Sequence, residues 1–114
     1  MITASIRGES LITKKSLSTT ATSVQVNRAA MDLLEAGLIA YQRGQPEQAR
    51  LKFEQVITLE PEYAAAYFYL GNLMFEQDQL DLALESLEKA HAIDPLHEDL
   101  AELILSIKQL LATP

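Results

Sequence analysis

The two histidines of this 114-residue chain, His91 and His97, are the side chains best suited to metal binding or proton transfer near neutral pH. They lie six positions apart with Pro95 between them. They therefore cannot share one helical face, as the two histidines of a zinc-binding pair do. We expect surface histidines near a turn, and no metal site.

The sixteen acidic residues are the other candidates for acid–base chemistry, and most fall on predicted solvent faces of helices. The chain has no cysteine, which excludes disulfides and thiolate metal sites. It also has no glycine-rich phosphate loop, nucleophile elbow or calcium loop. We therefore predict that the chain is not an enzyme, has no catalytic residues and uses no cofactor.

The elements that carry these residues are predicted to be helices, because apolar residues recur with a helical period from Ala29 onward. The pattern is broken at Pro46, Pro61, Asp78 and Pro95. Short connections require neighbouring helices to pack antiparallel, so the fold class is all-α. The five predicted helices span roughly residues 29–43, 46–59, 63–77, 80–93 and 97–112.

Residues 1–28 differ from the rest of the chain in composition. Ten of them are Ser or Thr, and four basic residues against one acidic residue give a charge of +3. Residues 29–114 carry five basic and fifteen acidic residues, a charge of −10. We predict a flexible basic Ser/Thr-rich tail over 1–28, followed by a helical domain over 29–114.

The charge and hydropathy patterns also limit partners and location. An acidic domain repels phosphate backbones, so we expect no nucleic acid partner. No apolar run approaches the ~20 residues that span a bilayer, so we expect no membrane insertion. We expect a cytoplasmic location. The alternative is mitochondrial, because the tail is basic, Ser-rich and poor in acidic residues.

A shift of 34 residues superposes the first predicted helix pair on the second. Small residues and helix breakers coincide, which is where backbone geometry restricts the choice of residue most. This predicts two helix–turn–helix repeats, over 30–63 and 64–97. The coinciding pairs are Ala30 with Ala64, Gly37 with Gly71, Gln45 with Gln79, Ala49 with Ala83, Glu54 with Glu88, and Pro61 with Pro95.

These residues resemble the tetratricopeptide repeat family, whose hairpins stack into an α-solenoid. The family's first-helix pattern resembles Leu33-x-x-Ala36-Gly37-x-x-Ala40 and, more closely, Tyr67-x-x-Leu70-Gly71-x-x-Met74. Its second-helix pattern is matched by Ala49-x-x-x-Phe53 and, with Leu for Phe, by Ala83-x-x-x-Leu87. The resemblance implies an antiparallel helix-hairpin solenoid of about five helices.

The physical reason for the pattern is close helix packing. The two glycines and the facing alanines, Ala49 and Ala83, should let the helices of each hairpin approach closely. Phe53 and Leu87 should then fill the wider space one turn along.

The last predicted helix, 97–112, departs from the repeat, because Leu105 stands where a third glycine would fall. We predict that this helix caps the second hairpin with one apolar stripe. The stripe comprises Leu100, Leu103, Ile104, Ile107, Leu110 and Leu111.

The resemblance also implies a binding surface, because the first helix of each hairpin lines a concave groove in this family. Carried over by position, the hypothetical peptide-binding groove comprises Met31, Leu34, Leu38, Tyr41, Phe68, Asn72 and Phe75. Tyr41, Phe68 and Phe75 would be the anchors, because buried aromatic side chains dominate interface energies. In the alternative, packing or the tail covers these side chains.

Three functions follow from this surface. The first is a protein–protein interaction module, such as an adaptor, scaffold or chaperone-like protein, that binds a partner peptide or helix. The second is a structural unit that uses the same apolar surface for self-association, giving a homodimer. In the third, the basic tail folds over the acidic domain and regulates it.

Overall fold

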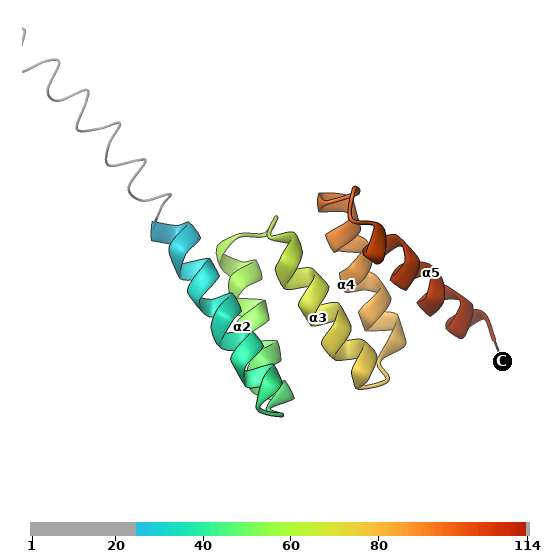
Figure 1. Cartoon of the computed structure of the whole chain (residues 1–114), viewed down its shortest axis with the longest axis horizontal. Coiled ribbons are helices and arrows are strands. Elements are labelled where there is room, and N and C mark those ends of the chain that lie inside the picture. Colours follow the sequence, from blue (N-terminus) through green and yellow to red (C-terminus); the bar gives the residue numbers. More distant parts are fainter. Residues whose placement is uncertain (1–24, 114) are drawn as a thin grey trace, which may run out of the picture.

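The computed structural model describes residues 25–113, and these residues form helices joined by short loops. Residues 25–42 are helical and are called the first helix here. Four further helices follow, α2 (Pro46–Leu59), α3 (Ala64–Glu76), α4 (Leu80–Ile93) and α5 (Glu98–Ala112). Successive helices lie side by side and alternate in direction (Figure 1). The predicted all-α solenoid of antiparallel hairpins is therefore confirmed, and residues 25–113 contain no strand.

The predicted helix boundaries agree with the structure to within about a residue, except at the start of the first helix. Residues 25–28 are helical, although the sequence analysis assigned them to the tail and began this helix at 29. Gln25, Val26, Asn27 and Arg28 include no Gly or Pro to stop a helix, so composition alone misplaced this boundary. The rest of the predicted tail lies outside the described residues.

The turns inside the two hairpins have the same backbone geometry. Gly44 and Asp78, 34 residues apart, have φ angles of 72° and 64°. The next amide in each turn, of Gln45 or Gln79, donates to a carbonyl five residues earlier at 2.9 Å. This is the Schellman arrangement that ends many helices. Asp78, which is a weak turn signal in the sequence, therefore adopts the same left-handed conformation as Gly44 and ends its helix in the same way.

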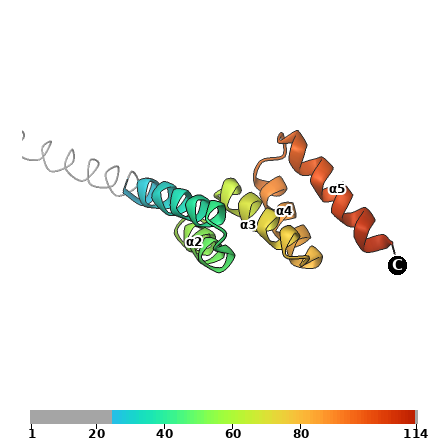
Figure 2. The same ribbon diagram turned by 60° about the horizontal axis from the view of Figure 1, so that its bottom comes forward.

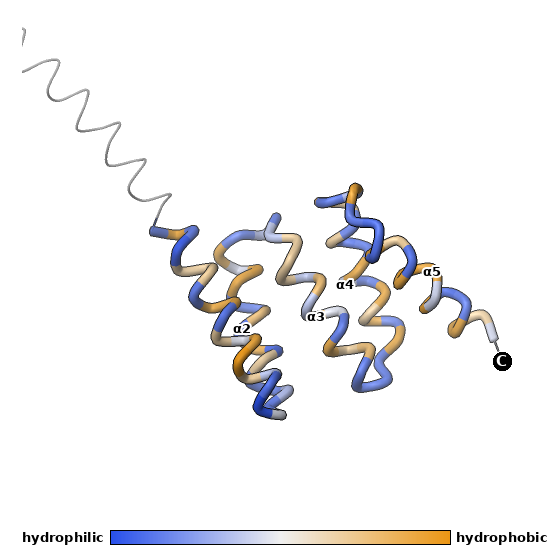
Figure 3. The backbone as a smooth tube through the Cα atoms, viewed as in Figure 1, coloured by the Kyte–Doolittle hydropathy of each residue, from blue (hydrophilic) through white to orange (hydrophobic). Residues whose placement is uncertain are grey.

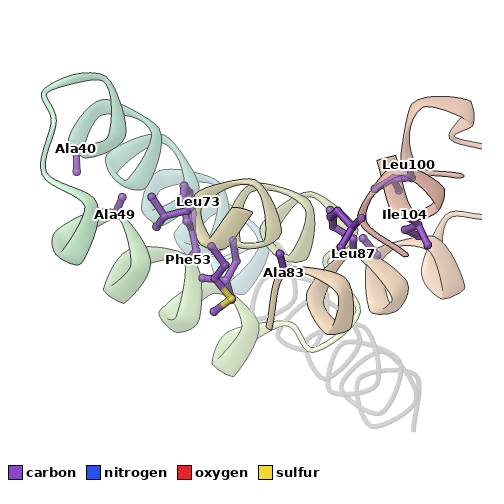
Figure 4. Packing of buried hydrophobic residues seen from close by; sticks show 12 residues of the cluster. Ala40, Ala49, Phe53, Leu73, Ala83, Leu87, Leu100 and Ile104 are labelled. Atoms are coloured by element: carbon purple, nitrogen blue, oxygen red, sulfur yellow. The ribbon is translucent and has the colours of Figure 1, made fainter. Parts of the chain in front are cut away.

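Each hairpin is closed by a large side chain that packs directly against a glycine. A Cβ atom on Gly37 would lie 2.6 Å from Cε1 of Phe53, and one on Gly71 would lie 2.7 Å from Cγ of Leu87. Phe53 and Leu87 are both fully buried. The prediction that they fill space one turn away is therefore corrected, because the missing glycine side chains make room for these two residues themselves. Figure 4 shows them beside Ala49 and Ala83 in the core.

The core continues from the hairpins to α5, which packs against α4. Leu100, Ile104 and Ile107 are buried, and Leu103 packs beside them, as predicted for a capping helix. Leu110 and Leu111 are exposed, so the predicted stripe is wrong for its last two members. Both ribbon views show α5 moving away from α4 toward its C-terminal end, which leaves these two residues uncovered (Figures 1 and 2).

Apolar and polar residues alternate along the helices, which places one face of each helix toward its neighbours (Figure 3). α3 is the most apolar helix, with thirteen residues of which only Asn72 and Glu76 are strongly polar. It packs against α2 and α4, and a hydrogen bond from Tyr41 to Glu76 also joins it to the first helix. A helix apolar on several sides is either buried on all of them or exposes a binding face.

Candidate functional site

Three of the predicted groove residues, Leu38, Tyr41 and Asn72, meet in one hollow between the first helix and α3. The hollow has a volume of about 370 Å³ and is called the first pocket. The helical period explains the meeting, because Leu38 and Tyr41 are three residues apart on one face of the first helix. The complete lining is Leu38, Tyr41, Gln42, Phe53, Tyr69 and Asn72.

Three of these lining residues were missed by the sequence analysis. Gln42 stands four residues after Leu38, so helical spacing could have identified it. Phe53 was assigned entirely to the core, yet its ring also borders the pocket. Tyr69 stacks on Phe53 with ring centroids 5.9 Å apart and planes inclined by 22°. This stacking depends on how α2 and α3 pack, and no spacing in the sequence signals it.

Phe68 lies in a second, smaller pocket of about 180 Å³ between α3 and the start of α5. The centroid of its ring lies 5.5 Å from that of Tyr69, in an edge-on arrangement, and 5.6 Å from that of His97. Tyr69 borders both pockets, so the two hollows are neighbours. The complete lining of the second pocket is Ala64, Ala65, Phe68, Tyr69, Asp94, His97 and Leu100.

The other predicted groove residues line neither pocket. Met31 is 55% exposed on the first helix. Leu34 is half-buried and packs against both hydrophobic clusters of the core, and Phe75 is half-buried against the larger one. The described structure therefore brings Leu38, Tyr41 and Asn72 together and places Phe68 next to them. Met31, Leu34 and Phe75 lie outside both pockets.

One carboxylate is hydrogen-bonded to a lining residue of the first pocket, and another lines the second pocket. The Tyr41 hydroxyl donates a hydrogen bond to Oε1 of Glu76, which joins the ends of the first helix and α3. This hydrogen bond is the main reason why the pKa of Tyr41 is raised, and burial and the Glu76 charge raise it further. Asp94 borders the second pocket. Lysine and arginine are absent from both linings, as far as the described residues show.

The two histidines lie at different places in the fold. His97 precedes α5 and contacts Phe68, whereas His91 on α4 borders a separate hollow toward α5. Among residues 25–113, no group of three or more histidine and acidic side chains is arranged to hold a metal ion. The described helices include none that is long and apolar enough to cross a membrane.

Comparisons with known proteins identify the family of this fold. The family model of the tetratricopeptide repeat matches residues 34–98. Human tetratricopeptide repeat protein 6 is 32% identical over 76 residues, which cover 67% of this chain and 15% of the human protein.

A crystal structure of MamA is similar in fold, with a TM-score of 0.67 and 21% identity, over 80% of this chain and 54% of that one. The chain thus spans a small part of the curated relative and about half of this solved structure. It belongs to the tetratricopeptide repeat family.

Proposed function

We propose that the chain is a non-catalytic adaptor, scaffold or chaperone-like module that binds an extended segment of a partner protein across the first helix and α3. The observation that carries this proposal is the first pocket, with a volume of about 370 Å³ and a mainly apolar and aromatic lining. Leu38, Tyr41, Phe53 and Tyr69 provide that lining. A pocket of this volume accommodates a large apolar side chain of a partner.

The two amides in the pocket complete the binding chemistry. Burying a leucine or phenylalanine side chain contributes about 1.5–3 kcal/mol, whereas specific orientation requires polar contacts. Gln42 and Asn72 each carry both a donor and an acceptor. They can therefore bond both the N–H and the C=O of a peptide backbone beside the anchored side chain.

The experiment selects binding peptides from a displayed random library against the immobilised full chain, and then measures their affinities by fluorescence anisotropy. Leu38→Glu places a charge in the apolar pocket and should weaken binding by about tenfold or more. Leu51→Glu is the matched control, because Leu51 is 55% exposed on α2 and lines neither pocket. Circular dichroism checks that both variants keep their helical content.

Equal affinities for the Leu38→Glu and Leu51→Glu variants would contradict a binding site in the first pocket. Asn72→Ala provides a second test that is gentler on the fold. It should lower affinity by a few-fold through a lost hydrogen bond, without changing the thermal midpoint by more than a few degrees.

A second function, self-association into a homodimer, is supported by apolar side chains on α5. Leu105 and Leu110 are more than half exposed there, and Leu96 in the preceding loop is 89% exposed. Sedimentation equilibrium over a concentration series should then show a dimer that Leu105→Glu dissociates. A monomer at all concentrations would contradict this second function and leave the groove proposal unaffected.

A further inference from the structure

The two pockets are placed to accept two side chains of one extended segment. They share Tyr69 as a common wall, with Asn72 on one side of it and Phe68 on the other. Alternate side chains of an extended peptide point to the same face, about 6.5–7 Å apart. Neighbouring hollows with a shared wall suit this spacing better than they suit a single compact ligand.

The charge around these pockets is strongly one-sided. Residues 60–102 contain eleven carboxylates and one lysine, Lys89. Nζ of Lys89 lies 3.7 Å from Oε1 of Glu85, so its charge is already compensated. The next cation, Lys108, has its Nζ 3.8 Å from Oε2 of Glu88. The second hairpin and the start of α5 therefore present a negative surface with little internal compensation.

Some of these carboxylates lie at the pockets themselves. Glu76 bonds Tyr41 at the first pocket, and Asp94 lines the second. The 34-residue shift that relates the two hairpins also relates Ala65 to Asp99 and Phe68 to Glu102. Asp99 and Glu102 are exposed, and they occupy on α5 the helix positions that line the second pocket on α3. The negative surface thus follows the same face onto α5.

We propose that the partner segment is cationic, with alternating apolar side chains for the two pockets and flanking lysine or arginine residues beside Glu76, Asp94 and α5. This inference rests on the proposed function and adds the chemical class of the partner. Complementary charge raises the association rate and suppresses partners of the wrong sign. An anionic segment would bring like charges together around both pockets, with no cation in either lining to compensate them.

Arginine is particularly well suited as the flanking residue at the edge of the second pocket. Its planar guanidinium stacks on aromatic rings and pairs with a carboxylate through two hydrogen bonds. Phe68 and Tyr69 supply the rings, and Asp94 supplies the carboxylate.

The test uses three synthetic peptides with the same Leu-Ser-Leu centre and with two lysines, two serines or two glutamates on each side. Their affinities for the full chain are measured by fluorescence anisotropy at low and high salt. The lysine peptide should bind at least about tenfold more tightly than the glutamate peptide at low salt. This ratio should shrink in ~1 M salt, where the Debye length falls to ~3 Å.

Substitution of the two carboxylates tests whether the preference for the lysine peptide arises at the pockets. Asp94→Asn and Glu76→Gln should each weaken binding of the lysine peptide by about two- to fivefold and leave the serine peptide unchanged. Asp81→Asn and Glu47→Gln are matched controls, because these exposed residues neither line a pocket, as Asp94 does, nor hydrogen-bond to a lining residue, as Glu76 does. An equal loss in the variants and in their controls would overturn the inference.

The failure of this inference can be told apart from the failure of the proposed function. Serine and lysine peptides of equal affinity, both weakened by Leu38→Glu, would overturn the cationic partner and leave the apolar groove standing. If neither Leu38→Glu nor replacement of the central leucines by serine changes the affinity, both the cationic partner and the apolar groove are overturned.

The chain's own basic residues are the competing occupant. If replacing Arg7, Lys14 and Lys15 by serine raises the affinity of the full chain for the lysine peptide severalfold, its own N-terminal residues occupy the groove. Concentration-dependent dimers in the parent chain would then assign that segment to a second copy. Either result overturns a separate cationic partner, and an unchanged affinity supports one.

Discussion

At the scale of single residues, the hairpins depend on two positions where a side chain must be absent. Gly71 faces Leu87, and Gly37 faces Phe53, at distances that an added Cβ could not occupy without displacing its neighbour. Gly44 is different, because no atom lies within 4 Å of its added Cβ and only its positive φ favours glycine. The three glycines therefore serve two separate physical purposes.

Substitution of Gly71 should accordingly cost more than substitution of Gly44. Gly71→Leu should overpack the second hairpin and abolish its cooperative unfolding, and Gly71→Ala should cost about 1–3 kcal/mol. Gly44→Ala should cost about 1–2 kcal/mol from backbone strain alone. Thermal unfolding followed by circular dichroism measures both, and a Gly71→Ala midpoint equal to that of the parent would contradict the close packing.

Tyr41 gives the stability a dependence on alkaline pH. Its pKa in the folded chain is raised, chiefly by the hydrogen bond to Glu76, so folding favours the protonated phenol. The resulting stabilisation is complete below the ordinary pKa of about 10 and is lost as the pH rises through the higher folded pKa. Between these limits the thermal midpoint of the parent should fall more steeply with pH than that of Tyr41→Phe.

Glu76→Gln provides the control for the cause of that effect. It removes the carboxylate that raises the pKa of Tyr41, so the alkaline dependence should become smaller. Identical pH profiles for the parent and Tyr41→Phe would show that the hydrogen bond contributes nothing to stability.

At the scale of elements, α5 covers the second hairpin with only some of its apolar residues. Leu100, Ile104 and Ile107 are buried, while Leu105 and Leu110 remain more than half exposed. One face of the helix thus completes the core and another is open to water. The exposed apolar residues of α5 form the surface proposed above for self-association.

The two faces of α5 should respond differently to the same truncation. Ile107→Ala should cost about 2–5 kcal/mol, because Ile107 is fully buried in the core. Leu110→Ala should change the free energy of unfolding by no more than about 0.5 kcal/mol, because Leu110 is 51% exposed. Denaturant unfolding measures both free energies, and similar losses would mean that Leu110 is covered in solution.

At the scale of the whole molecule, the aromatic side chains divide between the core and the two pockets. Phe53 is fully buried, whereas Phe68 is half-buried in the second pocket. The larger core cluster extends from Ala40 in the first helix to Ile107 in α5, and Leu34 and Ile57 connect it to the smaller cluster, so the helices should unfold together. The proposed binding surface would therefore be held by one cooperative unit.

Truncation of these two phenylalanines separates the core from the groove. Phe53→Ala should cost about 3–5 kcal/mol and leave the chain largely unfolded at 37 °C. Phe68→Ala should keep the helical content and a single transition, because its ring is only partly enclosed. A large loss of helicity in Phe68→Ala would place this ring in the core and contradict its assignment to the proposed groove.

The sequence by itself determined the repeat, the helices and the positions of close packing. Glycine, alanine and proline can be recognised in a sequence because local geometry leaves few other residues possible, as at Gly37, Ala49 and Pro61. The period of 34 follows from these residues alone. Helical spacing also determined that Leu38 and Tyr41 share a face, since three residues separate them.

Only the tertiary structure decided how these faces meet. The first pocket joins residues of three helices, and the stacking of Tyr69 on Phe53 depends on the packing of α2 against α3. The exposure of Leu110 likewise depends on the angle at which α5 leaves α4 (Figure 2). Periodicity fixes directions within one helix, whereas distances between helices come from side chains that interlock across the core.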